Sequence, residues 1–242
     1  SYEDGIYVTE IVVDGQPQGK LTNIFSRRDY EEFKNIEKID VSYLDTEKVT
    51  DMSYMFFGCG QVKELDLNNF DTHNVKSMAS MFVGCEQLTQ LDISSFDTSK
   101  VTDMSYMFSS CKNIQDVNVK GFDTSNVTTM AGMFYGCENV TQIDIDNFEM
   151  KNITDICAMF SGCKRIEKLD LSNINTKQVK SMQSLFAYCD NLKEVNLNGL
   201  QTDNVENMSR MFDGCLNLPN ISIKGFNTSR VQDMSYMFQG CT

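Results

Sequence analysis

The residues that most suggest chemistry in this chain are eight cysteines spaced 26 residues apart. They are Cys59, Cys85, Cys111, Cys137, Cys163, Cys189, Cys215 and Cys241. Zinc sites bring clustered thiolates to one point, whereas this spacing places one thiol in each copy of a repeat. Neighbouring thiols on parallel copies also lack the facing geometry that a disulfide needs. We therefore expect a column of buried free thiols that pack as small apolar side chains.

Cys157 is a ninth cysteine that lies outside this register. Other copies carry Ser, Ala or Gln at its position. Because reactive thiols need an exposed and polar setting, the sequence leaves two readings open, a reactive thiol or an inert small residue.

A column of acidic and amide residues recurs between the two apolar positions of an expected strand. Its members are Asp40, Asp66, Asp92, Asn118, Asp144, Asp170 and Asn196, with Ser222 last. Like charges that face each other across neighbouring strands repel, and a basic ligand or a bound cation would relieve that repulsion. We take this column as the candidate ligand-binding face. The alternative is a ladder that bonds to nearby backbone and adds solubility.

A second oxygen-rich column begins each copy of the repeat. Its members are Asp45, Asp71, Asp97, Asp123, Glu149, Asn175, Gln201 and Asn227, and Thr follows in seven of eight copies. Such residues bond back to nearby backbone N–H groups in turns, which is the reading we favour. Calcium is the alternative, because it prefers oxygen ligands. We assign no metal ligands and expect no other cofactor.

The sequence gives no support for catalysis. Its one histidine, His73, occupies a variable turn position, and nucleophilic triads, paired-histidine zinc motifs and phosphate-binding glycine loops are missing from it. Carboxylate pairs are plentiful, but a flat face has no desolvated cleft to separate their pKa values. We predict that the protein is not an enzyme.

The net charge of −13 restricts the partners that the chain can bind. Nucleic acids and anionic membranes would be repelled, because both are negatively charged. No apolar run approaches the roughly 20 residues of a membrane span, so we expect no direct membrane insertion. A protein ligand, and a basic one in particular, remains compatible with this charge.

These columns arise because the chain consists of a 26-residue repeat, for which residues 96–121 serve as the type copy. Seven full copies span residues 44–225, and a truncated eighth begins at Phe226 and stops before its strand. A fixed period of this length is typical of a solenoid in which each copy packs on its neighbours. An unfinished copy would expose core side chains, so we expect the chain to be part of a longer array, or an array whose cap is missing.

Residues 1–43 are predicted to form an N-terminal cap, made of a hairpin and a half-repeat. Residues 6–13 alternate as a strand does, residues 14–19 resemble a turn, and residues 27–33 suggest a short helix. Ile39 and Val41 already follow the register of the repeat.

The eighth position of each copy predicts the start of a short helix, because only N-cap residue types occur there. These residues are Asp51, Ser77, Asp103, Thr129, Asp155, Ser181, Asn207 and Asp233. Met104, Met107 and Phe108 then follow at helical spacing, and Gly precedes the Cys in six of eight copies, as at many helix C-termini.

After each cysteine, alternating apolar residues predict a short strand, such as Val117 and Val119 in one copy and Ile143 and Ile145 in the next. Each strand should pair in parallel with the strand of the next copy, about 4.8 Å away. The predicted fold class is therefore an α/β repeat solenoid. We expect a right-handed leucine-rich-repeat array with short parallel strands on one face and short helices on the other.

The pattern Phe-Asp-Thr-Ser-x-Val-Thr-Asp-Met-Ser-Tyr-Met-Phe-x-x-Cys at Phe96 closely resembles the 26-residue repeat of BspA-like leucine-rich-repeat surface proteins of bacteria. The resemblance spans residues 44–242. It implies a secreted or surface-anchored protein that adheres to host proteins, matrix or other microbes, and it supplies no catalytic residue. Met150 for Thr, Ile156 for Met and Tyr188 for Gly depart from the pattern.

The resemblance implies a non-catalytic protein-binding module of a bacterial cell-surface protein, with adhesion to host or neighbouring-cell proteins as its role. Two alternatives stay open: a structural stalk that displays another domain, and the recognition arm of an effector or sensor. A stalk should repeat its exposed residues, whereas a binder should vary them. The residue after the cysteine varies, as Glu86, Lys112 and Glu138 show, which favours a binder or neutral drift.

Overall fold

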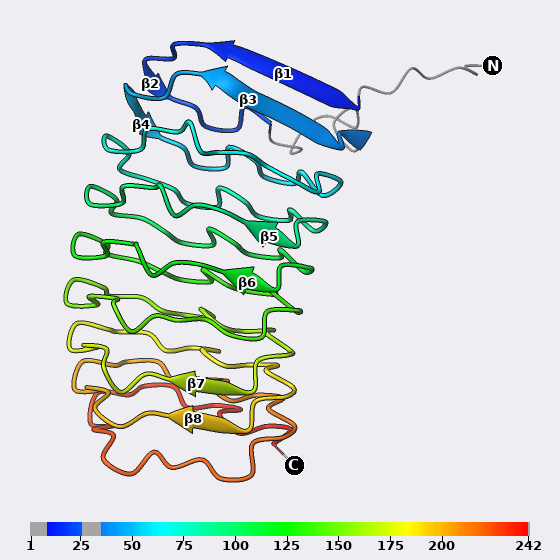
Figure 1. Ribbon diagram of the computed structural model, residues 1–242. Coiled ribbons are helices and arrows are strands. Elements are labelled where there is room, and N and C mark those ends of the chain that lie inside the picture. The colour runs from blue at the N-terminus through cyan, green and yellow to red at the C-terminus, as the bar shows by residue number, and fades with distance from the viewer. Residues whose placement is uncertain (1–8, 26–34, 242) are drawn as a thin grey trace.

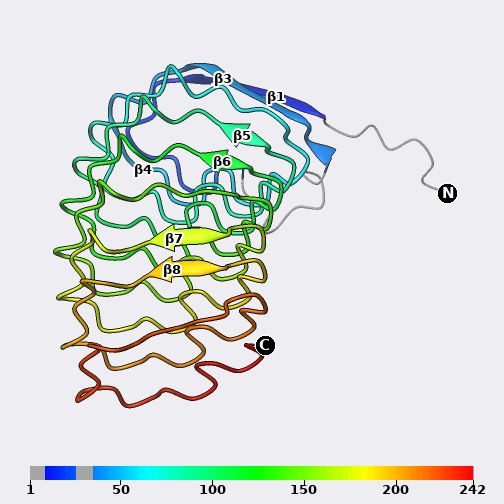
Figure 2. The same ribbon diagram turned by 60° about the horizontal axis from the view of Figure 1, so that its bottom comes forward.

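The computed structural model describes residues 9–25 and 35–241, which wind into a solenoid with one coil for each repeat (Figure 1). The coils stack from the N-terminal end to the C-terminal end without a break, and Figure 2 shows the same stack tilted. The expected helix at 27–33 lies outside the described residues. The strands are β1 (Glu10–Gly15), β2 (Gly19–Lys20), β3 (Lys38–Leu44), β4 (Val49–Asp51), β5 (Gln90–Leu91), β6 (Asp116–Val117), β7 (Lys168–Asp170) and β8 (Glu194–Asn196).

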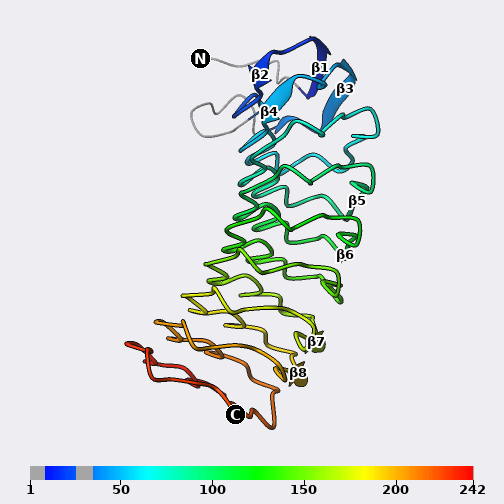
Figure 3. The ribbon, with the colours of Figure 1, turned by 90° about the vertical axis from the view of Figure 1, so that its left-hand side faces the viewer.

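Two parallel ladders run along the stack, on opposite sides of each coil (Figure 3). One contains the pairs β1–β3, β5–β6 and β7–β8, and in β5–β6 Leu91 lies opposite Val117, 26 residues later. The predicted parallel strands are therefore confirmed. The other ladder contains β2–β4 and continues as isolated bridges such as Asp51 to Ser77 and Ser77 to Asp103.

The predicted short helices are wrong, because the described residues contain no α-helix. The positions expected to cap helices form the second bridge ladder instead. Their side chains do accept an N–H two residues later, as Asp103 does from Ser105 at 2.8 Å. In a helix the following backbone N–H groups would bond to carbonyls of the same coil. Here every second backbone N–H bonds to a carbonyl of the next coil.

The segment after Asp103 consists of consecutive tight turns. Within the coil, the N–H of Met107 bonds to the carbonyl of Met104 at 3.3 Å. Alternate groups cross to the next coil, as the N–H of Tyr106 does to Ala131 at 2.8 Å. Tyr106 has a φ of 56°, as the third residue of a turn with a left-handed position requires. The glycine before the cysteine fills a second such position, so it marks a turn and not a helix end.

Spacing explains why turns replace helices on this side. A stack of phenylalanine rings runs through the core, one from each coil, with neighbouring centroids 5.3–6.0 Å apart. Packed helices need about 8–10 Å between their axes. Coils at this closer spacing can instead exchange backbone hydrogen bonds at both sides, as strands do. The rings are Phe25, Phe56, Phe82, Phe108, Phe134, Phe160, Phe186, Phe212 and Phe238.

The N-terminal segment follows the path of a coil and does not form the expected hairpin. β1 pairs with β3 and β2 pairs with β4, both in parallel, so β1 and β2 belong to different sheets. Gly15 and Gly19, with φ of 120° and 105°, turn the chain from one sheet to the other. Leu21 and Phe25 then enter the core as the apolar residues of a first coil.

The last coil is less buried than the others. Met234 and Phe238 are 39% and 43% exposed, whereas their equivalents one coil earlier, Met208 and Phe212, are fully buried. No described residue packs on the outer side of this coil.

Candidate ligand-binding face

The candidate binding column lies in or directly after the strands of the first ladder, with Asp40 inside β3 and Asp170 at the end of β7. In all eight copies the side-chain oxygen accepts the backbone N–H two residues later, at 2.8–3.3 Å. Asn118 and Asn196 make the same bond as the aspartates. The backbone therefore needs an acceptor at this position but does not need a charge, and five of eight copies carry a charge.

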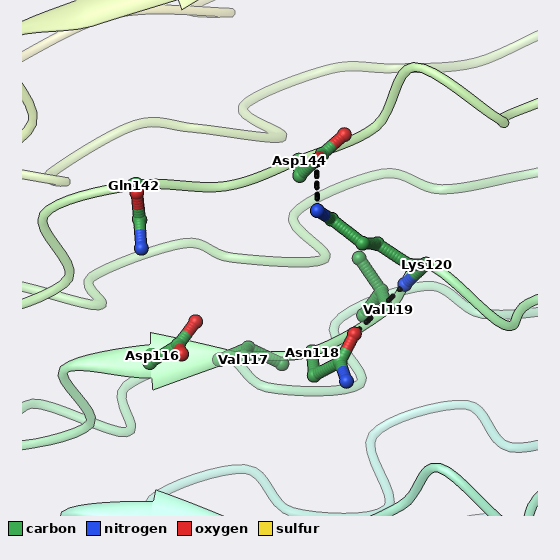
Figure 4. A pocket seen from close by; sticks show the side chains of 7 residues that line it. All are labelled: Asp116, Val117, Asn118, Val119, Lys120, Gln142 and Asp144. Carbon is green, nitrogen blue, oxygen red and sulfur yellow. Dashed lines mark hydrogen bonds and ion pairs between the residues drawn. The ribbon is translucent and has the colours of Figure 1, made fainter.

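Two shallow hollows open on this face. The larger, of about 580 Å³, is lined by residues that include Asp66, Asp92 and Asn118. The smaller, of about 250 Å³, lies next to it and includes Lys120 and Asp144 (Figure 4). The structure thus brings four column members, from Asp66 to Asp144, to one continuous surface. Asp40, Asp170 and Asn196 belong to the same column but line neither hollow.

Two carboxylates of the hollows, Asp92 and Asp144, are held in their charged form. The hydroxyl and the backbone N–H of Ser94 bond to Asp92 and lower the pKa of its carboxyl. The ammonium of Lys120, 2.9 Å from Asp144, lowers the pKa of that carboxyl. Both aspartates are therefore ionised at neutral pH, so the face is negatively charged.

Sequence reasoning missed Glu64 and Asp116, which line the larger hollow together with Asp66 and Asp92. Both stand two residues before a column member. Because side chains two apart share one face of a strand, this spacing could have identified them. The face therefore carries more negative charge than the column alone. Among the described residues no group of three or more His, Cys, Asp or Glu side chains is placed to hold a metal ion.

Six of the eight members of the second oxygen-rich column accept the N–H two residues later, as expected of turns, and Glu149 and Gln201 are the two exceptions. Asp97 accepts the N–H of Ser99 at 2.9 Å, and Asn175 accepts that of Lys177 at 3.1 Å. The threonine that follows was expected to bond to nearby backbone of its own turn, and it does not. Thr98 is buried and donates to the carbonyl of Asp123 in the next coil at 3.0 Å. Threonine therefore joins coils, and its burial explains its recurrence.

The eight cysteines form the expected column of free thiols, of which seven are buried and Cys241 is half-buried. Each thiol also donates to a carbonyl of the preceding coil, as Cys137 does to Phe108 at 3.1 Å. Burial raises the pKa of Cys111 to about 12. Cys157 is half-buried, and burial raises the pKa of its thiol too, so an inert small residue fits it better than a reactive one.

The variable residue after the cysteine has a structural explanation. Lys112 bonds to Glu86 of the preceding coil at 2.8 Å, and Lys164 bonds to Glu138 at 2.9 Å. The alternation of sign along this column therefore pairs neighbouring coils. Variation at this position therefore does not by itself indicate binding.

The chain also resembles known proteins. A leucine-rich-repeat protein of T. pallidum is 18% identical over 88% of this chain and 78% of its own, with a TM-score of 0.42. Leucine-rich-repeat proteins of Eubacterium ventriosum and Bacteroides ovatus are 19% and 16% identical, with TM-scores of 0.39 and 0.36. They are covered over 82% and 76% of their lengths, and they cover 96% and 97% of this chain. No curated protein matches it.

The described part of the chain contains no helix with the length and apolar character to cross a bilayer. A family model matches residues 20–143 and 133–242, which is most of the chain. The expected resemblance to BspA-like leucine-rich repeats of bacteria is confirmed. The chain belongs to the family described as Mycoplasma protein of unknown function, DUF285.

Proposed function

We propose that this solenoid is a non-catalytic protein-binding module that recognises a basic protein through its acidic strand face. The observation that carries the proposal is the pair of adjoining hollows from Asp66 to Asp144, which several carboxylates line. Their shallow form suits a protein surface better than a small molecule, because small-molecule sites enclose most of the ligand. From the family resemblance, we further propose that the protein lies at a bacterial cell surface and acts in adhesion.

Charge complementarity would determine how such a partner binds. Lysine and arginine side chains of the partner would meet carboxylates that repeat at the coil spacing. Exposed charge pairs of this kind speed association and select the partner, and salt weakens them. The proposal therefore requires binding that declines as ionic strength rises.

The first experiment measures binding of the immobilised chain to a basic protein such as lysozyme, against an acidic protein of similar size. We expect measurable binding of the basic protein alone, with an affinity that falls at least tenfold between about 0.05 M and about 0.5 M salt. Binding that is absent at low salt, or that does not depend on salt, would contradict the proposal.

A structural stalk is the second candidate. The ion pairs between successive coils favour it, because Lys112 pairs with Glu86 at 2.8 Å and Lys164 pairs with Glu138 at 2.9 Å, which holds neighbouring coils together. A stalk would bind neither protein in this experiment. The recognition arm of an effector would behave as the proposed module does, so only its cellular location would distinguish it.

A further inference from the structure

A groove away from the acidic strand face crosses four successive coils on the side of the tight turns. It has a volume of about 400 Å³, and its lining includes Tyr135, Gly136, Gly162 and Tyr188. The two tyrosines are 45% and 50% exposed, among the most exposed aromatic side chains of the described residues. Solvent-exposed aromatic rings that flank a groove are typical of binding sites.

Tyr188 occupies the groove at an energetic cost. Six of eight copies carry Gly at this position, and Tyr188 keeps the left-handed backbone of those glycines, with a φ of 57°. This conformation is unfavourable for any residue with a side chain, although Tyr54, Tyr106 and Tyr236 adopt it at another turn of the coil. Glycine serves the neighbouring coils at this position, at Gly162 and Gly214, whereas Tyr188 adds a ring that contacts the next coil at Gly214.

The ring of Tyr188 is also held in place. It packs on Gly214 so closely that an added Cβ there would lie 2.7 Å from the ring. Its hydroxyl bonds to Asp213 at 3.4 Å, and Arg210 bonds to the same carboxylate oxygen at 2.8 Å. An aromatic surface with a fixed orientation loses little conformational entropy when a ligand stacks on it.

The polar groups around the groove are balanced in charge. Lys164 pairs with Glu138 at 2.9 Å, and Lys112 and Asp190 add one charge of each sign. In a chain with a net charge of −13, this balance favours a ligand without charge. Such a ligand must both donate to carboxylates and accept from ammonium groups, which hydroxyl groups do.

The floor of the groove excludes recognition through the backbone. The N–H of Gly136 bonds to Ser161 and that of Gly162 to Ala187, both at 2.7 Å. An extended peptide normally binds by pairing its backbone with free N–H and carbonyl groups. With these donors already used, aromatic faces and charged side chains are what the groove offers a ligand.

We propose that this groove binds an uncharged saccharide. Its sugar rings stack their C–H faces on Tyr135 and Tyr188, whose ring faces carry partial negative charge. Its hydroxyl groups bond to Glu138 and Lys164. The site is separate from the acidic strand face, so the chain would bind a protein and a glycan on different sides.

Tyrosine fluorescence tests this proposal, because the chain has no tryptophan to obscure it. The probes are the neutral tetrasaccharides of glucose, galactose, mannose and N-acetylglucosamine. We expect a saturable change with at least one of them, at a dissociation constant of about 1 mM or below. No saturable change with any of the four up to about 10 mM would overturn the proposal.

Two variants identify the site without harming the fold. Tyr188→Gly restores the common residue, so it should raise the melting temperature while weakening saccharide binding at least tenfold. Tyr135→Ser copies Ser161 of the next coil and should weaken binding equally. Tyr43→Ser, at an exposed tyrosine in β3, is the control and should leave binding unchanged. Binding that survives both groove variants, or a proline-rich peptide that binds in a tyrosine-dependent way, would overturn the proposal.

Discussion

The thiol of Cys111 donates a hydrogen bond to the backbone carbonyl of Phe82, 29 residues earlier, at 3.1 Å. The same carbonyl accepts the N–H of Cys85 in its own coil, also at 3.1 Å. One carbonyl thus closes a turn and joins two coils. The repeating cysteine is a small core residue that also supplies a donor where one is needed, which no apolar residue of its size does.

Alkaline pH should destabilise the protein through these thiols. The pKa of Cys111 is about 12 in the folded chain, against 9.0 in the absence of burial. Its contribution to stability is present below about pH 9 and is lost as pH rises toward 12, because only the unfolded thiol ionises there. Urea unfolding from about pH 8 to about pH 11 should show a falling free energy. Cys111→Ala should make this fall shallower, and an unchanged slope would contradict the thiol account.

Removal of the hydroxyl from a threonine that joins two coils should destabilise the protein. Thr176 is fully buried, donates to the carbonyl of Gln201 at 2.9 Å and accepts its N–H at 2.8 Å. Thr176→Val keeps the shape but leaves both groups unpaired, which should cost about 1–3 kcal/mol in the free energy of unfolding. Thr176→Ser keeps the hydroxyl and serves as the control. Equal urea midpoints for the two variants would show that the hydroxyl adds nothing.

Two glycines of one coil should respond differently to a methyl group. Gly132 and Gly136 have φ of 59° and 69°, so alanine costs each about 1 kcal/mol of backbone strain. At Gly132 a Cβ would also lie 2.2 Å from the ring of Tyr106, whereas at Gly136 the nearest atom is 3.5 Å away. Gly132→Ala should therefore be less stable than Gly136→Ala by about 1 kcal/mol.

Removal of the Tyr106 ring, which lies against Gly132, checks this explanation. In the Tyr106→Ala background the two glycine variants should become equally stable, because the ring is gone. A difference that persists there would place its cause in the backbone and not in the ring.

Acid should weaken the fold through the carboxylates of the strand face. Hydrogen bonds from Ser94 and Ser172 lower the pKa of Asp92 and Asp170. The stability that these bonds give is present above the usual aspartate pKa of about 4 and is lost as pH falls through the lowered values. In thermal melts, Asp92→Asn and Asp170→Asn should reduce the dependence on pH below about 4 and change the melting temperature little at pH 7. A large drop in melting temperature at pH 7 would contradict this, because it would show that the fold needs the charges of Asp92 and Asp170.

The sequence predicted those features that depend on a single copy and its period. Repetition of Cys111 and Phe108 indicated a stacked core, and alternation at Val117 and Val119 indicated parallel strands. Helices were predicted wrongly because Asp103 and the glycine before the cysteine favour a tight turn as much as a helix. The choice between them depends on hydrogen bonds to the next coil, which the pattern within one coil does not show.

The candidate site was predictable to a similar degree. The column from Asp66 to Asp144 was found because its side chains recur at the position between two apolar residues. Glu64 and Asp116 were missed because they belong to a more variable position of the same face. The groove was not predicted. Tyr188 departs from the repeat, but the sequence does not show that Tyr135, two coils earlier, lines the same groove.

The central claim is that the strand face, and not net charge, recognises a basic protein. Two variants with equal net charge test it directly: one changes Asp66, Asp92, Asp144 and Asp170 to Asn, and the other changes Asp45, Asp71, Asp97 and Asp123 to Asn. Both keep their turns, because Asn118 and Asn175 already form the same bonds. We predict that lysozyme binding at low salt falls at least tenfold in the first variant and less than twofold in the second. Equal losses in the two variants would contradict the account.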